Sequence, residues 1–374
     1  MTEKCIHICY LADAMSPHTA KLAEYFQKKS FKVDIVSFDS KYSGEIGSHY
    51  VKTGLFSKSK VKYIVGLSKL KKEIKKICPD VLHAIYATSY GFAGAHLNFH
   101  PYIISVIGSD VAVQPKKSAV FKWLLQYATN KADAIHSQSQ HLTDELVSLG
   151  VNLKKISTFT YGVEGVIDGP FPSAIDSARN GRTVVSTRAF ESVYNIKLLI
   201  SAIPLVLKKI PDAKFLIIGK GSQENELKNQ SIKLKINSSV EFMGHLSHEK
   251  LLEVLKSADV YVSTSLSDGQ SISLLEGMAA GAFPVVTDIV ANQSWVRDGE
   301  NGLLNSTFDS VDLANKIIRA LSDTELRKRA TVINKKMIDE KGSFEKNMML
   351  MEKIYLDLTG YNSKLRSSHK KEHK

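Results

Sequence analysis

The sequence predicts an α/β protein with two doubly wound parallel sheets, each in its own domain. Short apolar and β-branched runs alternate with helical stretches along most of the chain, which is the pattern of parallel sheets covered by helices. The alternation occurs on both sides of about residue 165. The chain has 374 residues, more than one ordinary core holds, and it suits two domains of roughly 170 residues each.

The first domain is expected over residues 1–164. Its first strand is the apolar run Cys5–Leu11, and a helix over 18–29 then leads to a second strand over 32–37. His18 stands at the start of this helix, where it can contact an anion or simply cap the helix.

A basic stretch follows the second strand. Eight lysines lie between Lys58 and Lys76, and apolar residues are interleaved with them at near-helical spacing. Such an amphipathic surface suits an anionic membrane, and a solvated helix face with a core side is an equally good interpretation. The net charge of +12 also allows nucleic acid binding, but no recognised motif or aromatic platform supports it.

The segment 81–109 contains no Asp, Glu, Lys or Arg and is long enough to cross a bilayer. Its Gly, Asn, His and Pro residues favour a buried strand, helix and strand instead. His83 lies in the first of these strands, and Gly108, Ser109 and Asp110 follow the second. Polar groups at the carboxyl ends of parallel strands are candidates for ligand contacts.

The two domains are expected to be joined by a linker over 165–182, because Gly and Pro residues gather there. A last long helix is predicted at about 344–358. The basic tail over 361–374 has the composition of a disordered segment.

The second domain, expected over 183–343, begins with a strand that ends at Arg188. An arginine at a strand's carboxyl end can bind a diphosphate with two parallel hydrogen bonds and stabilise the charge of a leaving group. A surface ion pair is the alternative. The next strand enters the turn Gly219-Lys220-Gly221 but lacks the third glycine and the acid of a dinucleotide fingerprint, which argues against a nicotinamide dehydrogenase.

A strand over 260–265 is followed by a break at 267–269 and a helix over 272–280. The unpaired N–H groups at the start of that helix are a candidate cradle for a diphosphate or for sugar oxygens. Glu276 lies further along the helix, where its carboxylate can accept hydrogen bonds from ribose hydroxyls. In the alternative interpretation Asp268 only caps the helix and Glu276 is a solvated surface charge.

Three segments together carry a resemblance to a known family: Phe242–Leu246, the segment from Asp268 to Glu276, and Val296–Leu304. They are similar to the donor-binding signature of the retaining glycosyltransferases of GT-B fold, specifically glycosyltransferase family 4. The resemblance extends over most of the chain. It implies two Rossmann-like domains facing across a cleft, an acceptor-binding first domain, a donor-binding second domain, and a last helix that packs back on the first domain.

The resemblance also implies roles for single residues. Asp268 would hold the donor sugar, Glu276 the ribose, Arg188 the diphosphate and Ser271 the sugar or phosphate oxygens. Asp110 and His83 are the expected catalytic groups of the first domain. The other expected contacts are Gly269, Gln270, Ile272, Gly244, His245 and Lys197 on the donor side, and Ser109, Gly108 and His18 on the acceptor side.

Three positions depart from the family's pattern. Asp268 stands where a glutamate is usual, Tyr194-Asn195 stands where a Lys-Gly pair is usual, and Ile107 stands where many relatives have a histidine. His83 is the expected substitute for that histidine, and Lys197 is the basic residue nearest to the missing lysine.

Cysteine usage and the start of the chain suggest where the protein works. Three cysteines without metal spacing fit a reducing compartment, and the chain opens directly on a polar turn and a strand rather than on a signal peptide. We expect a cytoplasmic protein, peripheral at the inner face of the plasma membrane if the basic stretch binds lipid. Its oligomeric state is not readable from the sequence.

These observations predict a metal-independent, retaining, hexosyltransferase-type enzyme without a cofactor. It would pass a sugar from a nucleotide-sugar, with UDP as the expected nucleotide, to a hydroxyl of a lipid-linked or cell-surface glycan. Two alternatives stay open: a sugar-binding or scaffold subunit that has lost catalysis, and a GT-B nucleotide-sugar epimerase. Fold analogy alone does not separate them.

Overall fold

The computed structural model describes residues 5–164 and 181–361. It divides into two compact units, of which the first combines Met1–Phe159 with Met348–Lys374 and the second is Thr160–Asn347. The predicted linker at 165–182 and the predicted tail at 361–374 lie almost entirely outside the described residues.

The first unit contains a seven-stranded sheet in the order β3-β2-β1-β4-β5-β6-β7, and every pair of neighbouring strands is parallel. The order reverses between β1 and β4, because the chain builds outward from β1 in one direction and then from β4 in the other. The strands are β1 (His7–Leu11), β2 (Lys32–Ser37), β3 (Gly47–Tyr50), β4 (Val81–Ile85), β5 (Tyr102–Val106), β6 (Ala134–Ser137) and β7 (Ile156–Thr158).

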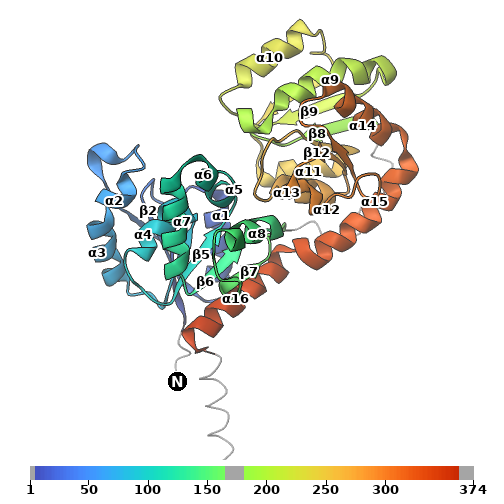
Figure 1. Cartoon of the computed structure of the whole chain (residues 1–374). Helices are drawn as coiled ribbons and strands as arrows, with labels where there is room; N and C mark the ends of the chain where they lie inside the picture. The colour runs from blue at the N-terminus through green and yellow to red at the C-terminus, as the bar shows by residue number, and fades with distance from the viewer. Residues whose placement is uncertain (1–4, 165–180, 362–374) are drawn as a thin grey trace, which may run out of the picture. The chain divides into compact units, whose positions relative to one another are not determined.

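Helices cover both faces of this sheet, so its central strands are mostly apolar and are buried along their whole length, with His7, His83 and Ser105 as buried polar residues. The elements between the strands (Figure 1) are α1 (Pro17–Lys28), η1 (Gly54–Phe56), α2 (Lys62–Val65), α3 (Leu67–Ile77), the π-helical turn η2 (Ala87–Gly91), α4 (Phe92–Ala95), α5 (Ser109–Ala112), α6 (Gln114–Lys117), α7 (Ala119–Lys131), α8 (Gln140–Ser148) and η3 (Leu153–Lys155).

The basic stretch forms three short elements, η1, α2 and α3. Gly66 separates the two α-helices, and it lies so close to the Phe38 ring that a Cβ there would clash with it. In α3 the core side is Leu70 and Ile74, while most of its lysines are exposed. The segment thus has the core side of an ordinary helix together with a basic outer face.

The second unit contains a six-stranded sheet in the order β10-β9-β8-β11-β12-β13, again with parallel neighbours throughout. Here the order reverses between β8 and β11. The strands are β8 (Thr183–Ser186), β9 (Lys214–Ile218), β10 (Val240–Gly244), β11 (Val260–Ser263), β12 (Phe283–Thr287) and β13 (Leu303–Asn305).

Two layers of helices enclose this second sheet. Residues of α9 and α14 pack in one apolar core with the strands, and residues of α11 and α12 pack in another, so the two pairs cover opposite faces (Figure 1). The elements are η4 (Ser192–Tyr194), α9 (Ile196–Lys209), α10 (Glu224–Lys233), α11 (His248–Ser257), α12 (Ile272–Ala279), α13 (Val290–Gln293), α14 (Ser310–Ser322), α15 (Thr324–Met337) and the π-helical turn η5 (Ile338–Gly342).

The last helix, α16 (Phe344–Thr359), belongs to the first unit from Met348 onward. Tyr355 fixes it there, because this side chain is fully buried, packs edge-on against Phe26 at 5.0 Å and shares a hydrogen bond of 3.0 Å with the Tyr10 hydroxyl. The predicted α/β class with two doubly wound parallel sheets is confirmed by both units.

Ligands of doubly wound sheets bind outside the carboxyl ends of the strands where the strand order reverses. In the second unit that point lies between the ends of β8 and β11, which lead to Arg188 and to Asp268. In the first unit it lies between the ends of β1 and β4, and Tyr86 follows β4 directly. The topology thus marks one candidate region in each unit.

Candidate active site

Arg188 is the centre of the candidate site in the second unit. Its guanidinium donates from Nη2 to Asp268 Oδ2 at 2.5 Å, and from Nη1 to the hydroxyl oxygens of Ser271 at 3.0 Å and Ser273 at 2.7 Å. The whole residue is only 8% exposed. The buried Arg188 side chain therefore joins the loop after β8 to the loop after β11, the neighbouring strand.

An aromatic ring supports the guanidinium. The Arg188 Cζ atom lies 4.2 Å from the centroid of the Tyr194 ring, which comes from η4, so Arg188 makes a cation–π contact with a tyrosine. Tyr194 stands where the family resemblance leads us to expect a lysine. In this chain the position orients the arginine and adds no second positive charge.

Burial alone lowers the pKa of Arg188, but the Asp268 carboxylate and the neighbouring Tyr261 and Tyr194 side chains more than reverse this effect and raise it. The guanidinium therefore stays charged. Its Nε and the Nε2 of Gln270 are buried without a hydrogen-bond partner among the described residues. Buried donors of this kind are rare in proteins, and here both can donate to oxygens of a ligand.

The start of α12 lies beside these donors. Ser271 is the N-cap residue, and its hydroxyl accepts a hydrogen bond from the Leu274 N–H at 3.4 Å. Asp268 is therefore not the cap of this helix. Gln270 is held by the Trp295 Nε1, which donates to Gln270 Oε1 at 3.2 Å, and Ile272 opens the helix itself.

Glu276 lies in the same helix, with its side chain 12% exposed and its Oε1 at 3.6 Å from Nδ1 of His248 in α11. A glutamate buried to this degree is not a solvated surface charge. The geometry thus argues against the simpler interpretation of both acids, since neither caps α12 and neither is solvated.

The remaining donor-side residues are more dispersed. Gly244 ends β10 at φ +68°, a conformation that suits glycine, and His245 after it is exposed. Lys197 pairs with Glu226 of α10 at 2.5 Å, so its charge is compensated there. Gly269 lies in the loop between Asp268 and the start of α12.

Lys220 is a cation that the sequence analysis gave no role. It follows Gly219 at the carboxyl end of β9, and a Cβ at Gly244 would lie 3.6 Å from Lys220 Cε. The sequence signal for Lys220 was the turn Gly219-Lys220-Gly221. A turn at the carboxyl end of β9 lies beside the carboxyl end of β10, because the two strands are parallel neighbours. Ser273, the third partner of Arg188, was missed as well.

Asp110 of the first unit is fully buried. Its carboxylate accepts hydrogen bonds from the backbone N–H groups of Ala87 at 2.9 Å, Gly108 at 2.9 Å and Ile107 at 3.3 Å, and burial raises its pKa in spite of them. Asp110 thus links the loop after β4 to the loop after β5 through hydrogen bonds. Beside it, the Ser109 hydroxyl lies 2.6 Å from the Tyr86 hydroxyl.

His83 is also fully buried, and both of its ring nitrogens are engaged. Nδ1 lies 2.7 Å from the Tyr355 hydroxyl, and Nε2 lies 2.7 Å from Ser105 Oγ, which is itself 2.9 Å from His136 Nδ1. Burial, and then the neighbouring His136, lower the pKa of His83 to about 3. The imidazole is therefore neutral and bound into the core.

His18 is the second residue of α1, and burial followed by the charge of Lys21 lowers its pKa. The structure brings Arg188, Asp268, Gln270 and Ser271 together in one cluster. It does not bring Lys197 into that cluster.

Within residues 5–164 and 181–361, no group of three or more His, Cys, Asp or Glu side chains could hold a metal ion, and the three cysteines form no disulfide. Within the same residues no helix has both the length and the apolar character that a membrane span needs.

Comparisons with known proteins agree with the geometry. Residues 172–337 match the family described as glycosyl transferases group 1, and residues 7–139 match the family described as glycosyl transferase 4-like. The chain is 27% identical over 303 residues, 80% of its length, to an uncharacterized glycosyltransferase of Methanocaldococcus jannaschii, of which the match covers 82%.

A second relative matches over a shorter part of the chain. It is the phosphatidyl-myo-inositol mannosyltransferase of Mycolicibacterium smegmatis, 34% identical over 40% of this chain and 38% of that protein.

Two solved structures share the fold. Anabaena HepE, determined in complex with UDP and glucose, superposes with a TM-score of 0.74 at 17% identity over 93% of this chain and 99% of HepE. The sucrose-phosphate synthase of Thermosynechococcus elongatus gives a TM-score of 0.80 at 17% identity over 95% of this chain and all of that one.

Proposed function

We propose a specific reaction from the premise that this chain belongs to the family 4 glycosyltransferases of GT-B architecture. In this proposal the protein is a retaining enzyme that transfers a sugar from a UDP-sugar to a hydroxyl of a membrane-associated lipid-linked or cell-surface glycan. The observation that carries the proposal is the buried Arg188 guanidinium, charged and with a free Nε, at the reversal point of the second sheet.

The choice of UDP draws on relatives of the same fold. Anabaena HepE was determined with UDP and with UDP-glucose, and a pneumococcal O-GlcNAc transferase was determined with UDP and GlcNAc. We assign the ribose of the donor to Glu276, because a carboxylate that is largely withdrawn from water gains most from accepting two hydroxyl donors.

We assign the diphosphate to Arg188 and to the first N–H groups of α12. In the reaction, the bond between the sugar's anomeric carbon and the diphosphate oxygen breaks, and the acceptor oxygen bonds to the same carbon from the same face. The departing diphosphate takes up the acceptor's proton. Arg188 and α12 stabilise the negative charge that develops, and the site otherwise acts by positioning. The proposal gives no step to a metal ion or to a cofactor.

Asp268 has a double role in this proposal. A carboxylate offers about four acceptor positions, so Asp268 can keep one oxygen on Arg188 while the other accepts a hydroxyl of the transferred sugar. Ser271 Oγ and Gln270 Nε2 then face the phosphate or sugar oxygens. Gly244 and His245 are assigned to the nucleobase, as the family resemblance implies.

The acceptor assignment draws on the basic surface of the first unit. Exposed lysines of α3 and exposed apolar side chains of η1 and α2 occur together there, which suits an anionic lipid surface. A relative whose name gives phosphatidyl-myo-inositol as its acceptor points the same way. We therefore place the enzyme at the inner face of the plasma membrane, in the synthesis of a cell-envelope glycan.

A second function is favoured by one observation. Tyr194 occupies the position of the expected lysine and stacks on Arg188, so the site has one cation fewer than the family pattern. A protein that binds nucleotide-sugars without transferring the sugar would fit this arrangement.

The test is isothermal titration with UDP-, GDP- and ADP-sugars, followed by incubation of the selected donor with membranes and measurement of released nucleoside diphosphate. Arg329→Ala serves as the control for Arg188→Ala, because Arg329 is an exposed arginine of α15 in the same unit, outside the donor-binding signature. Binding of one donor with turnover, lost in Arg188→Ala only, is the expected result. Binding without turnover on any membrane acceptor would favour the second function, and no binding of any donor would reject both.

A further inference from the structure

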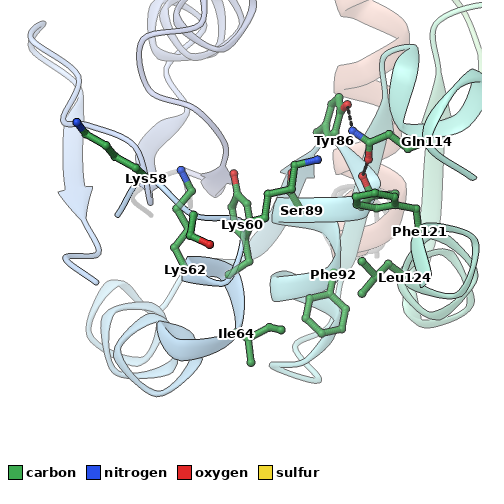
Figure 2. Close-up of a pocket in the computed structure, with 13 residues that line it drawn as sticks. Lys58, Lys60, Lys62, Ile64, Tyr86, Ser89, Phe92, Gln114, Phe121 and Leu124 are labelled. Carbon is green, nitrogen blue, oxygen red and sulfur yellow. Dashed lines mark hydrogen bonds between the residues drawn. The ribbon is translucent and has the colours of Figure 1, made fainter. Parts of the chain in front are cut away.

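The first unit contains a cavity of about 330 Å³ near the reversal point of its sheet. Figure 2 shows two walls, one from the segment that leads into α2 and one from α6, α7 and the turn after β4. This volume lies in the range of pockets for small ligands. Thirteen residues line it: Lys58, Ser59, Lys60, Lys62, Tyr63, Ile64, Tyr86, Thr88, Ser89, Phe92, Gln114, Phe121 and Leu124.

The cavity has an excess of positive charge. Three of its lining residues are lysines and none is an acid. Lys62 is compensated by an ion pair with Asp39 just outside the lining. Lys60 lies with its Nζ 4.6 Å from the centre of the Phe121 ring, a contact that leaves its charge uncompensated, and Lys58 is exposed. Figure 2 shows the Lys58 amine pointing away from the opposite wall, so the Lys60 charge is the one that remains for a ligand.

The polar edge of the cavity is built before any ligand arrives. Gln114 Nε2 donates to the Tyr86 hydroxyl at 2.8 Å, as the dashed line in Figure 2 shows, and the Thr88 hydroxyl donates to Gln114 Oε1 at 2.5 Å. Tyr86 has φ +84°, which is strained for a tyrosine. Strain of this kind persists where the surroundings hold a side chain in place.

The remaining lining is apolar. Ile64, Phe92, Phe121 and Leu124 come from both walls, and Ile64 is largely exposed toward solvent. Leu55 and Phe56 of the neighbouring η1 are exposed as well. The cavity thus offers a lysine amine to an anion and hydrocarbon contacts to the group that carries it.

We propose that this cavity is the subsite for a phosphate ester carried by the acceptor, with Lys60 as its principal ligand. The proposal rests on the proposed function and deepens it by naming the chemistry of the acceptor. A phosphate monoester carries roughly two negative charges at neutral pH, so it gains from the uncompensated Lys60 amine and can accept hydrogen bonds from the hydroxyl groups at the polar edge. The ester belongs either to a soluble sugar or polyol phosphate or to the head group of a lipid.

The first experimental arm uses a soluble phosphate ester. Glycerol 3-phosphate is titrated into the wild-type chain, Lys60→Gln and Lys28→Gln, where Lys28 is an exposed lysine at the end of α1, outside the cavity and outside the basic stretch 58–76. Both substitutions remove one charge from a solvent-exposed side chain. We expect Lys60→Gln to bind about tenfold more weakly, because a charge-assisted hydrogen bond is lost, and Lys28→Gln to bind as the wild type does.

The second arm uses flotation with vesicles of phosphatidylcholine alone and of phosphatidylcholine mixed with phosphatidic acid, whose head group is a phosphate monoester. If the ester is carried by a lipid, the wild type and Lys28→Gln float with the mixed vesicles, Lys60→Gln floats much less, and glycerol 3-phosphate alone binds weakly. If the ester is soluble, the first arm shows the difference and flotation is equal in the three proteins.

The proposal is overturned if Lys60→Gln and Lys28→Gln behave alike in both arms. Titration of the same proteins with a UDP-sugar separates this failure from a failure of the proposed function. Donor binding that is intact in all three proteins, without an effect of Lys60→Gln on phosphate esters, rejects only the subsite. A Lys60-dependent phosphate site in a chain that binds no donor rejects only the transferase.

Discussion

The Asp268 carboxylate lies 2.5 Å from the Arg188 guanidinium, so the residue expected to hold the donor sugar is paired with the residue expected to hold the diphosphate. Both side chains are largely buried, at 15% and 9% exposed. Asp268 therefore orients Arg188 and at the same time competes with any phosphate that approaches it. This relationship gives the candidate site its most specific prediction.

Substitution of Asp268 by Asn should strengthen the binding of UDP and weaken transfer. Without the competing carboxylate, Arg188 offers its full charge to the diphosphate. If the ion pair with Asp268 costs the diphosphate about 1 kcal/mol of binding free energy, its removal tightens UDP binding about fivefold. Turnover should fall because the amide has only one acceptor oxygen, and its NH2 group cannot accept a hydrogen bond from the sugar hydroxyl. Titration with UDP and a turnover assay measure the two effects, with Asp212→Asn as the control at an exposed ion pair. Weaker UDP binding in Asp268→Asn would contradict the competition.

Removal of the Tyr194 ring should weaken UDP binding, because the ring holds the guanidinium from one side at 4.2 Å. A partly desolvated cation–π contact contributes about 1 kcal/mol, so Tyr194→Ala should bind UDP about fivefold more weakly. Tyr194→Phe retains the ring and should bind as the wild type does. Equal affinities of Ala and Phe variants would show that the ring does not position Arg188.

Glu276→Gln should remove the enzyme's preference for an intact ribose. A carboxylate that accepts hydrogen bonds from the two hydroxyls gives the wild type about tenfold tighter binding of UDP than of 2′,3′-dideoxy-UDP. The variant should bind the two nucleotides with nearly equal affinity. Titration of both proteins with both nucleotides isolates the ribose contact from the diphosphate contact. A preference that survives the substitution would place the ribose elsewhere.

Acid should destabilise the first unit through His83 and His136. Burial lowers their pKa values to about 3 and about 4, below the ordinary value of 6.5. Below pH 6.5 the unfolded chain takes up protons that the folded chain does not, so stability is complete above that pH and is lost as the pH falls toward the folded values. The loss is roughly 2 kcal/mol per histidine at pH 5.

Urea unfolding of the full chain between pH 5 and pH 7.5 checks this prediction. His83→Gln should give a shallower dependence of the unfolding free energy on pH than the wild type does. His96→Gln, at an exposed position of the same unit, should leave the dependence unchanged. Equal slopes in wild type and His83→Gln would show that His83 is not held neutral.

The fold followed from the sequence because its signals are local. A parallel strand covered on both faces, such as residues 215–218 of β9, is a continuous apolar run, and Gly219 marks its end. The positions of Arg188, Asp268 and Ser271 after strand ends followed from the same pattern together with the family resemblance.

The pairing of side chains did not follow, because it joins residues far apart in the chain. Arg188 meets Asp268 across 80 positions, and His83 meets Tyr355 across 272. A histidine in an apolar strand has the same sequence pattern whether its imidazole faces a ligand or a tyrosine of a distant helix. The cavity around Lys60 is also formed by three separate segments, which no local pattern connects.

The central claim is that Arg188 holds the diphosphate of a uridine nucleotide. It is tested most directly by the affinity difference between UDP and uridine in the wild type, Arg188→Ala and the exposed control Arg329→Ala. We predict that the wild type and Arg329→Ala bind UDP much more tightly than uridine, and that Arg188→Ala loses about tenfold or more of this difference. An undiminished difference in Arg188→Ala would contradict the account.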